Sequence, residues 1–589
     1  MAMAISMNPA IILLYPPLLF LFGRAIAFLL NTLRPKSFPP GPRGHLGLGN
    51  LLQINKRFPF LSYGTWAQTY GKDTPLGIKR VTSNVVVLNS ARLVRELFER
   101  RGAIYSDRPW QFMNHTWIYN GDMREAIFMN NGAWLTKWRK EFNNHFGPAA
   151  ITRLRPVYEA ETARLLVMLL KLDGPMRKSS SSAAADLEAI LLGWLMSVPS
   201  LGVCGKRLDT MDDLGLTPER FKECTDEYAA VAAPTMRDLF PILRYVPEVF
   251  GMAGWKERAR AVRRDIMQIG TKFVTAAEEQ RAALDTGKST IGWESMLARM
   301  LKEQREKGED MFTVMDMGNT ACHVVAAAMN TSLSVFSIML LILAKHRDVQ
   351  DRVRKEVLEV SGGRAPKAAN LPSLKYTEAF WNEVLLTHIS ILHGLRCEVN
   401  IYLRRTQVHR WRPVAPQGVP HAPSRDDIYN GHRIPKGTTM IMNVWQIHHS
   451  PEDYDSPDEF IPERFLRHPF GMRPDQAHDA AHLESASARV TYDFGAGRRI
   501  CPGMHSAKQS LLLGLAKVLW AFDVVPPEGS EIDLSLETGF VQDIALHPKK
   551  FDVVLRLREG RTREEVLDHY ERAYEGEAEV MGWKDGLYK

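Results

Sequence analysis

The sequence has few cysteines and lacks several patterns that mark large classes of proteins. Its 589 residues contain no G-x-G-x-x-G or P-loop pattern, which argues against a nucleotide-binding enzyme. No run of basic residues interleaved with aromatic residues is present, so the net charge of +8 does not indicate nucleic-acid binding. An anionic membrane surface or an acidic partner protein remains open. The cysteines are odd in number and scattered, which argues against a disulfide framework and leaves one thiol for a metal: Cys204, Cys224, Cys322, Cys397 and Cys501.

A long apolar run at the N-terminus predicts a membrane anchor. Residues 10–30 are almost wholly apolar, and about 20 such residues span the hydrocarbon core of a bilayer. Arg34 and Lys36 follow, which predicts that the body of the protein faces the cytoplasm. Because Arg24 interrupts the run, a helix lying in the membrane interface is the alternative.

The chain divides into an anchor, a stiff hinge, one large domain and a tail. Helical periodicity dominates the domain, and short β-rich runs occur at residues 76–88 and 429–442. The predicted fold class is mainly α with a small β-region. The predicted boundaries are 1–32 for the anchor, 33–45 for the Pro-rich hinge, 46–558 for the domain and 559–589 for a charged, helical and peripheral tail.

One decapeptide, FGAGRRICPG at residues 494–503, predicts a cysteine thiolate bound to haem iron. Its glycines allow the backbone to approach a flat macrocycle, and Arg498 and Arg499 supply positive charge for haem propionates. Cys501 precedes an apolar run, so the N-terminus of a helix is expected to favour its thiolate. The alternative is a Gly-rich turn that holds a buried structural cysteine.

The decapeptide matches the haem-binding signature of the cytochrome P450 family, F-x-x-G-x-R-x-C-x-G, at Phe494, Gly497, Arg499, Cys501 and Gly503. The resemblance extends from about residue 39 to residue 558. It implies the cytochrome P450 fold, with haem as the cofactor and the Cys501 thiolate as its axial ligand.

A second resemblance lies in residues 318–360, the longest predicted helix. In the family, an acid-Thr pair in this helix manages protons during oxygen activation, which makes Thr331 and Asn330 the candidate catalytic residues. Asn330 stands where an acid is common, and an amide cannot relay a proton as a carboxylate does. Oxygen activation is therefore expected to depend on Thr331 and ordered water. The alternatives are a buried core helix or a second membrane helix.

Three further residues resemble the family's propionate contacts. The segment from Trp134 to Arg139 is similar to the helix that places an aromatic and a basic side chain against a propionate, although Arg139 comes one position later than the family's basic residue. His421 fits a position that meets a propionate. A basic surface helix that contacts a redox partner is the alternative for the first segment.

The family's E-x-x-R pattern is interrupted. Glu383 fits the glutamate, but Leu386 stands where the arginine is expected. A buried glutamate without that partner would cost about 3 to 5 kcal/mol. Joining the preceding leucine to Arg410 restores the pattern and a charge network of Glu383, Arg410 and Arg464. We therefore interpret residues 386–409 as an insertion, such as a retained intron translated in frame, with an unusual surface loop as the alternative.

The resemblance implies a haem-thiolate monooxygenase that inserts one atom of O₂ into a hydrophobic small molecule. Electrons would come from NADPH through a separate cytochrome P450 reductase, docked on a basic face that includes Arg498 and Lys508. The expected location is the endoplasmic reticulum membrane, with a single span and the catalytic domain in the cytoplasm. The general pattern resembles fungal members of secondary metabolism. The alternatives are a reductase-independent haem-thiolate isomerase or dehydratase, and a non-catalytic product disabled by the insertion.

Overall fold

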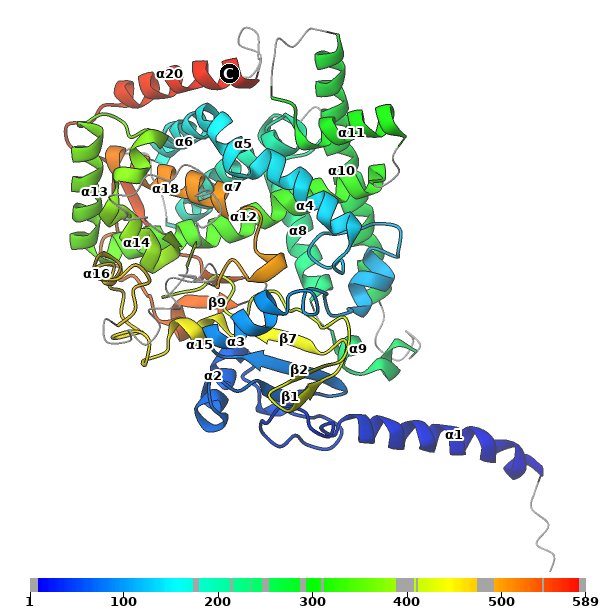
Figure 1. Cartoon of the computed structure of the whole chain (residues 1–589). Coiled ribbons are helices and arrows are strands. Elements are labelled where there is room, and N and C mark those ends of the chain that lie inside the picture. Colours follow the sequence, from blue (N-terminus) through cyan, green and yellow to red (C-terminus); the bar gives the residue numbers. More distant parts are fainter. Residues whose placement is uncertain are drawn as a thin grey trace, which may run out of the picture.

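Helices make up most of the structure, and the sheet of β1 (Leu76–Arg80), β2 (Ser83–Leu88) and β7 (Thr439–Met442) lies on one side of it (Figure 1). The computed structural model describes residues 9–172, 180–211, 215–233, 235–245, 254–286, 293–308, 312–387, 407–408, 411–473, 492–542 and 545–581. The helix α12 (Val314–Lys345) crosses the middle of the body, and α1 (Pro9–Asn31) projects away from it. The predicted mainly helical fold with a small β-region is confirmed.

The other helices pack around α12 or lie at the edges of the body. In chain order they are α2 (Pro59–Tyr70), α3 (Ala91–Val94), the π-helices η2 (Arg95–Arg100) and η3 (Met113–Ile118), α4 (Ala133–Phe146), α5 (Pro148–Arg153), α6 (Arg155–Leu169), α7 (Ser180–Cys204), α8 (Pro218–Ala232), α9 (Met236–Leu239), α10 (Trp255–Asp285), α11 (Met296–Lys307), α13 (Arg347–Ser361), α14 (Lys375–Leu385), α15 (Val444–His448), α16 (Arg464–Arg467), α18 (Met504–Ala521), α19 (Leu536–Gly539) and α20 (Arg563–Met581).

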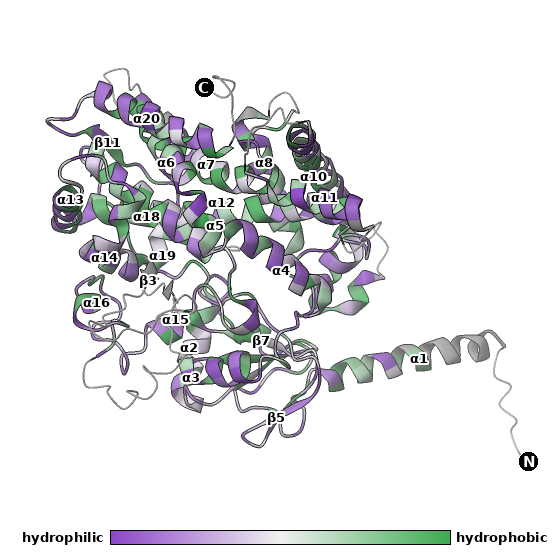
Figure 2. Cartoon of the chain, turned by 45° about the horizontal axis from the view of Figure 1, so that its top comes forward, coloured by the Kyte–Doolittle hydropathy of each residue, from purple (hydrophilic) through white to green (hydrophobic). Residues whose placement is uncertain are grey.

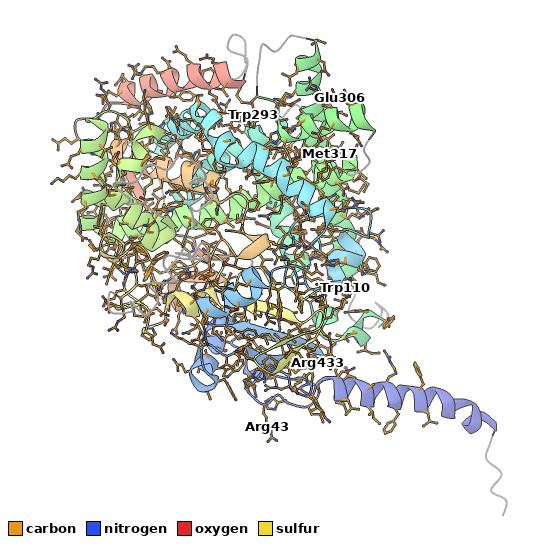
Figure 3. The ribbon with its side chains drawn as sticks, viewed as in Figure 1. Arg43, Trp110, Trp293, Glu306, Met317 and Arg433 are labelled. Carbon is orange, nitrogen blue, oxygen red and sulfur yellow. The ribbon has the colours of Figure 1, made fainter. Side chains whose placement is uncertain are left out.

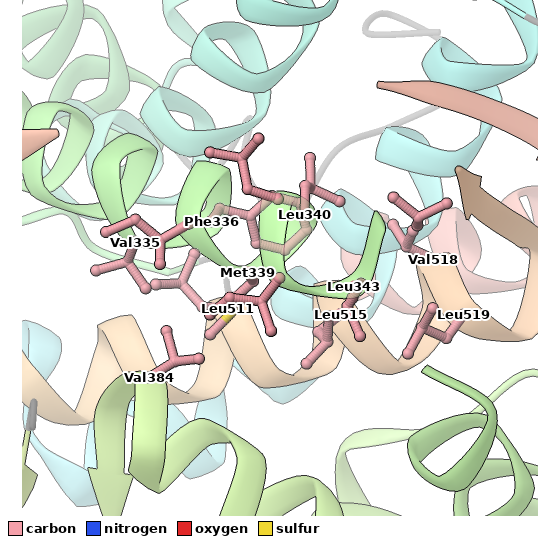
Figure 4. Packing of buried hydrophobic residues seen from close by; sticks show 14 of the residues in the cluster. Val335, Phe336, Met339, Leu340, Leu343, Val384, Leu511, Leu515, Val518 and Leu519 are labelled. Atoms are coloured by element: carbon pink, nitrogen blue, oxygen red, sulfur yellow. The ribbon is translucent and has the colours of Figure 1, made fainter. Parts of the chain in front are cut away.

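The central helix α12 is defined by its ends and by its packing. Thr313 and Asp316 form a capping box at its start, and it ends at His346, where α13 begins. The predicted stretch 318–360 is therefore two helices. Part of the main hydrophobic cluster lies where α12 crosses α18 (Figure 4), and its residues include Val335, Phe336, Met339, Leu340, Leu343, Val384, Leu511, Leu515, Val518 and Leu519. Because α18 follows Cys501 almost directly, this packing fixes the position of the cysteine loop.

Two described helices are long and apolar enough to cross a membrane, but most of each is buried in the body. They are α12 and the part of α7 from Asp186 onward. Figure 2 shows hydrophobic residues along α12 in the interior of the body. Both are therefore interior helices, and the alternative of α12 as a second membrane helix is not supported.

The β-region consists of short strand pairs. In the main sheet, β1 and β2 are antiparallel, and β7 runs parallel to β2. The predicted hairpin over 429–442 lies earlier, because β5 (Asp427–Tyr429) and β6 (His432–Ile434) turn at Asn430 and Gly431, both with positive φ. The remaining described pairs are β8 (Phe522–Val525) with β11 (Val554–Leu557), β9 (Phe540–Gln542) with β10 (Leu546–Pro548), and β3 (Leu386–Thr387) with β4 (Gln407–Val408).

The β3–β4 pair joins the two ends of the inferred insertion. Both strands lie against α14, and the Trp411 N–H donates to the Glu383 carbonyl across 3.3 Å. The chain therefore leaves α14 and returns to it at one place, as a looped-out insertion requires. Arg410 and residues 388–406 lie outside the described residues.

The tail differs from the expectation of a peripheral segment. It contains the predicted helix, α20, but Val566, Tyr574, Glu577 and Met581 are buried against the body. The main contact of α20 is with α6. The tail is therefore an integral part of the described body.

Candidate active site

The cysteine loop is held in a tight backbone turn between Tyr492 and α18. The Cys501 N–H donates to the Phe494 carbonyl across 2.7 Å. Gly497 has φ of 61°, and a Cβ atom there would lie 2.0 Å from the Phe98 carbonyl oxygen on η2. Only glycine fits such a conformation and such a contact, so the signature's glycine is explained by the packing of the loop on η2.

Cys501 lies deep in the protein, yet its side chain is partly accessible. Burial raises the pKa of its thiol, and this effect exceeds the opposing effects of the Gly503 and Met504 backbone and of the Arg139 charge. The backbone at the helix N-terminus thus favours the thiolate, as expected, but burial outweighs this effect. A bound cation is needed to hold the sulfur as a thiolate, and a metal ion supplies one.

The other described cysteines have different surroundings. Cys322 on α12 is buried, and its thiol donates to the Ile266 carbonyl of α10 across 3.7 Å. Burial and the neighbouring Cys224 raise the pKa of Cys322, and no cation is among the causes. Cys204 is buried as well. These thiols pack between helices as structural residues, which leaves Cys501 as the ligand candidate among the described cysteines.

Three arginines form a cluster beside the cysteine loop, which we call the arginine cluster: the buried Arg499 and the half-buried Arg108 and Arg139. Their guanidinium groups donate to backbone carbonyls. Arg499 donates to the carbonyls of Ser106 (2.8 Å), Ala126 (3.1 Å) and Met129. Arg139 donates to the carbonyl of Ile500 (2.6 Å). Arg108 donates to the carbonyls of Ile127, Val419 and Pro420 (2.7 to 2.9 Å).

Among the described residues, acids only partly offset the charges of the arginine cluster: Glu125 opposes the effect of burial on the pKa of Arg108 and Arg499, and Asp107 adds to this at Arg499. Burial and the charge of Arg139 lower the pKa of Arg499 to about 10, and burial and the charge of Arg499 lower the pKa of Arg108 well below its ordinary value. Among the described residues, no carboxylate lies within ion-pairing distance of these three side chains. Three cations of this kind favour a dianionic group, and the two propionates of haem are such a group. The residues therefore fit haem.

His421 lies next to the arginine cluster, whereas Trp134 does not. His421 stacks on Phe98, and its Nδ1 lies 2.7 Å from the Tyr105 carbonyl. Burial and the charge of Arg108 lower the pKa of His421 well below its ordinary value, so the ring is neutral. Trp134 packs against Phe312, on a different face of α4 from Arg139. Arg498 is exposed and also stands outside the cluster.

The helix α12 presents an open row of side chains in the middle of the body. Ala327 and Thr331 are one turn apart and exposed, although most of the helix is buried. Because α12 crosses the interior (Figure 1), this exposure indicates an internal space. The Thr331 hydroxyl donates to the Ala327 carbonyl across 2.8 Å, and the half-buried Asn330 lies beside it.

Glu383 and Arg464 lie together as a buried ion pair, with 3.3 Å between Nε and a carboxylate oxygen. The Ile461 N–H also donates to Glu383 across 2.9 Å, and Arg464 donates to the Asp455 and Ser456 carbonyls. Arg410, the predicted third member of this network, lies outside the described residues.

Sequence reasoning missed several groups of this site. Arg108 carries no motif, and its role follows only from its position beside Arg499. Tyr119, Tyr228 and His323 form a hydrogen-bonded set from three different elements. The sequence contained one indication that His323 belongs to the site. His323, Ala327 and Thr331 follow the i, i+4, i+8 spacing of one helix face.

The fold and this site together define a class, the haem-thiolate proteins. The family model described as Cytochrome P450 matches residues 39–396 and 408–555, and the unmatched residues 397–407 lie inside the inferred insertion. The chain belongs to the cytochrome P450 family. Members use haem with a cysteine thiolate as the axial ligand, and the chain is accordingly an oxidoreductase that incorporates oxygen from O₂.

Curated relatives match the chain over nearly its whole length. Cytochrome P450 monooxygenase grgG of Penicillium sp is 67% identical over 576 residues, which cover 98% of each chain. Cytochrome P450 monooxygenase yanC of Aspergillus niger is 29% identical over 558 residues, or 93% of this chain and 94% of the relative. Cytochrome P450 monooxygenase fogE of Aspergillus ruber is 30% identical over 500 residues, or 83% of this chain and 81% of the relative.

Proposed function

We propose that the protein is a membrane-anchored monooxygenase of fungal secondary metabolism that inserts one oxygen atom of O₂ into a hydrophobic small molecule. The second oxygen atom leaves as water, with electrons from NADPH delivered through a separate cytochrome P450 reductase. The observation that supports this most strongly is the deep, partly accessible Cys501 beside three arginines that have no ion-pair partner among the described residues.

Each residue of the site has a defined task in this proposal. Cys501 ligates the iron, and the arginine cluster binds the propionates. The bound haem supplies the iron at which oxygen is activated. Thr331 borders the internal space along the open row of α12. Because the Thr331 hydroxyl donates its proton to the Ala327 carbonyl, the Thr331 oxygen can accept a hydrogen bond from a water molecule. Asn330 holds that water through its amide, so solvent supplies the protons.

Apolar surface next to α1 supports membrane attachment. Phe28 of α1 packs against Phe240 at 6.2 Å between ring centroids. Ile242 (63% exposed) and Tyr245 (81% exposed) follow Phe240, and Trp110 is exposed on the same side of the body (Figure 3). We propose that this surface rests on the endoplasmic reticulum membrane while residues 1–32 anchor the chain by a single span. Deleting residues 1–32 should then weaken membrane association without abolishing it, as fractionation with a carbonate wash would measure.

The reductase would bind a face that includes the exposed Arg498. Lys508 contributes less than its charge suggests, because it forms a 2.9 Å ion pair with Glu378. Charge reversal by Arg498→Glu should raise the reductase concentration needed for half-maximal turnover and leave the haem spectrum unchanged.

The direct test uses the purified holoprotein and two cysteine variants. Wild type and Cys322→Ala should both give the reduced carbon monoxide spectrum of a thiolate-ligated haem, whereas Cys501→Ala should lose it. Loss of the spectrum in Cys322→Ala with retention in Cys501→Ala would reassign the ligand. Turnover that requires NADPH and reductase supports the monooxygenase, whereas conversion of a hydroperoxide without them would support the isomerase or dehydratase.

A further inference from the structure

A polar set of three side chains stands in an otherwise apolar part of the interior. The Tyr119 hydroxyl lies 2.7 Å from the Tyr228 hydroxyl and 3.0 Å from Nε2 of His323. The three residues come from the chain after η3, from α8 and from α12. Trp117, Phe128 and Met129 are among the apolar residues packed around them.

This polar set borders the open row on α12. His323 lies one turn before Ala327 and two turns before Thr331, which is about 12 Å along the helix axis at about 1.5 Å per residue. His323 is half-buried. Tyr228 lies deep in the protein, yet its side chain is partly accessible, which is the pattern seen at Cys501.

The direction of the hydrogen bonds follows from the backbone of α12. Nδ1 of His323 lies 2.8 Å from the Asn319 carbonyl, which can only accept, so Nδ1 donates to it. Nε2 is then an acceptor, and the Tyr119 hydroxyl must donate to it. The Tyr119 hydroxyl has one proton, which it donates to His323, so the hydrogen bond between the two tyrosines is donated by Tyr228. The Tyr228 oxygen is left with lone pairs, and in the described part of the chain its hydroxyl has no second partner.

The charge around Tyr228 also favours a ligand that donates a hydrogen bond to it. Burial raises the pKa of both tyrosines, and the nearby Glu125 carboxylate raises it further. A negative potential at Tyr228 favours a hydrogen-bond donor and disfavours an anion.

We propose that Tyr228, oriented by Tyr119 and His323, accepts a hydrogen bond from a hydroxyl group of the substrate, and that this hydroxyl lies at the end of an otherwise apolar molecule that is remote from Thr331. The substrate class is therefore an extended, neutral hydroxylated compound, not a carboxylic acid. The inference rests on the proposed function, because it places the oxidised carbon near Thr331.

The test uses three probes that differ in one group: 4-phenylphenol, 4-methoxybiphenyl and biphenyl-4-carboxylate. Binding to the holoprotein is followed by the change in haem spin state on titration. The phenol should bind about 3- to 10-fold more tightly than the ether, as one hydrogen bond predicts. The carboxylate should bind weakest.

Variants separate recognition from general damage. Tyr228→Phe should bring the phenol-to-ether affinity ratio close to one while leaving the affinity for 4-methoxybiphenyl unchanged. Tyr119→Phe should also reduce the ratio, because it frees the Tyr228 proton and lets that hydroxyl donate to the ether. The exposed Tyr245→Phe is the control and should preserve the ratio.

An unchanged ratio in Tyr228→Phe, tightest binding of the carboxylate, or no spectral response to any probe would overturn the inference. An intact thiolate spectrum and NADPH-dependent turnover in the same preparation would leave the proposed function standing. Absence of that spectrum from wild type would instead overturn the proposed function itself.

Discussion

Two clusters of charged residues inside this protein differ in their balance of acids and arginines. The first, which we call the α6–α20 cluster, consists of Glu161, Arg164, Arg207, Asp209 and Glu577. Arg207 pairs with both Glu161 and Glu577, and Arg164 pairs with Asp209. The arginine cluster beside Cys501 contains cations and no acid within ion-pairing distance among the described residues.

The charges of the α6–α20 cluster balance when Glu577 carries a proton. Burial and the neighbouring Glu161 raise the pKa of Glu577 well above its ordinary value. One oxygen of each acid lacks a hydrogen-bond partner if both are ionised, and a proton on Glu577, shared with Glu161, satisfies this requirement. With Glu577 neutral, two arginines face two carboxylates. A cluster with no net charge can serve to join elements of the fold, whereas a cluster with a net positive charge requires an anionic ligand.

The largest expected effect comes from breaking the balanced cluster. Arg207→Met leaves Glu161 buried without its main cation and should lower the free energy of unfolding by about 3 to 5 kcal/mol. Denaturant unfolding of holoprotein and apoprotein should show the same loss in both, because haem does not contact this cluster. The exposed Arg572→Met on α20 is the control and should change stability by less than about 0.5 kcal/mol. A loss confined to the holoprotein would contradict the comparison.

The arginine cluster should respond in the opposite way to haem. Arg139→Met removes one of three repelling charges, so the apoprotein should keep its stability or gain slightly. The holoprotein should lose about 1.5 to 3 kcal/mol, the contribution of a hydrogen bond to a charged partner. The measurements are unfolding of both forms and the rate of haem transfer to apomyoglobin.

Two matched variants give this prediction its controls. Arg139→Lys keeps the charge and should retain part of the haem affinity. Arg498→Met, next to the cysteine loop but exposed, should leave the rate of haem transfer unchanged. Equal losses in apoprotein and holoprotein for Arg139→Met would show that the arginine cluster is structural.

Sequence predicted the parts of this site that depend on a local backbone shape. The cysteine loop needs glycine where it touches η2, so its pattern is readable without a structure. The arginine cluster forms where three segments that are far apart in the sequence meet, and no local sequence pattern at Arg108 predicts it. The tail appeared peripheral because α20 carries many charges, but a buried face needs only a few positions such as Val566 and Glu577.

The misplaced hairpin has a different cause. Asn430-Gly431 is the strongest short-range signal for a two-residue turn, and it was present in the sequence. The later Pro435-Lys436-Gly437 segment also has turn residues, and it connects β6 to β7. Local signals thus located both turns, but the pairing of β7 with β2 is set by contacts far away in the chain.

The smallest expected effect is a change in pH dependence at the balanced cluster. Because the pKa of Glu577 is raised in the folded state, the folded protein holds a proton that the unfolded chain releases above about pH 4.5. The contribution of Glu577 to stability is therefore greatest below that pH and declines as pH rises toward the raised pKa. Glu577→Gln keeps one donor for Glu161 and one acceptor for Arg207, so it should cost less than about 1 kcal/mol at pH 5 and flatten the decline between pH 5 and 8. Unfolding of wild type and variant across this range measures the difference, and an unchanged slope in the variant would mean that Glu577 is ionised in the folded protein.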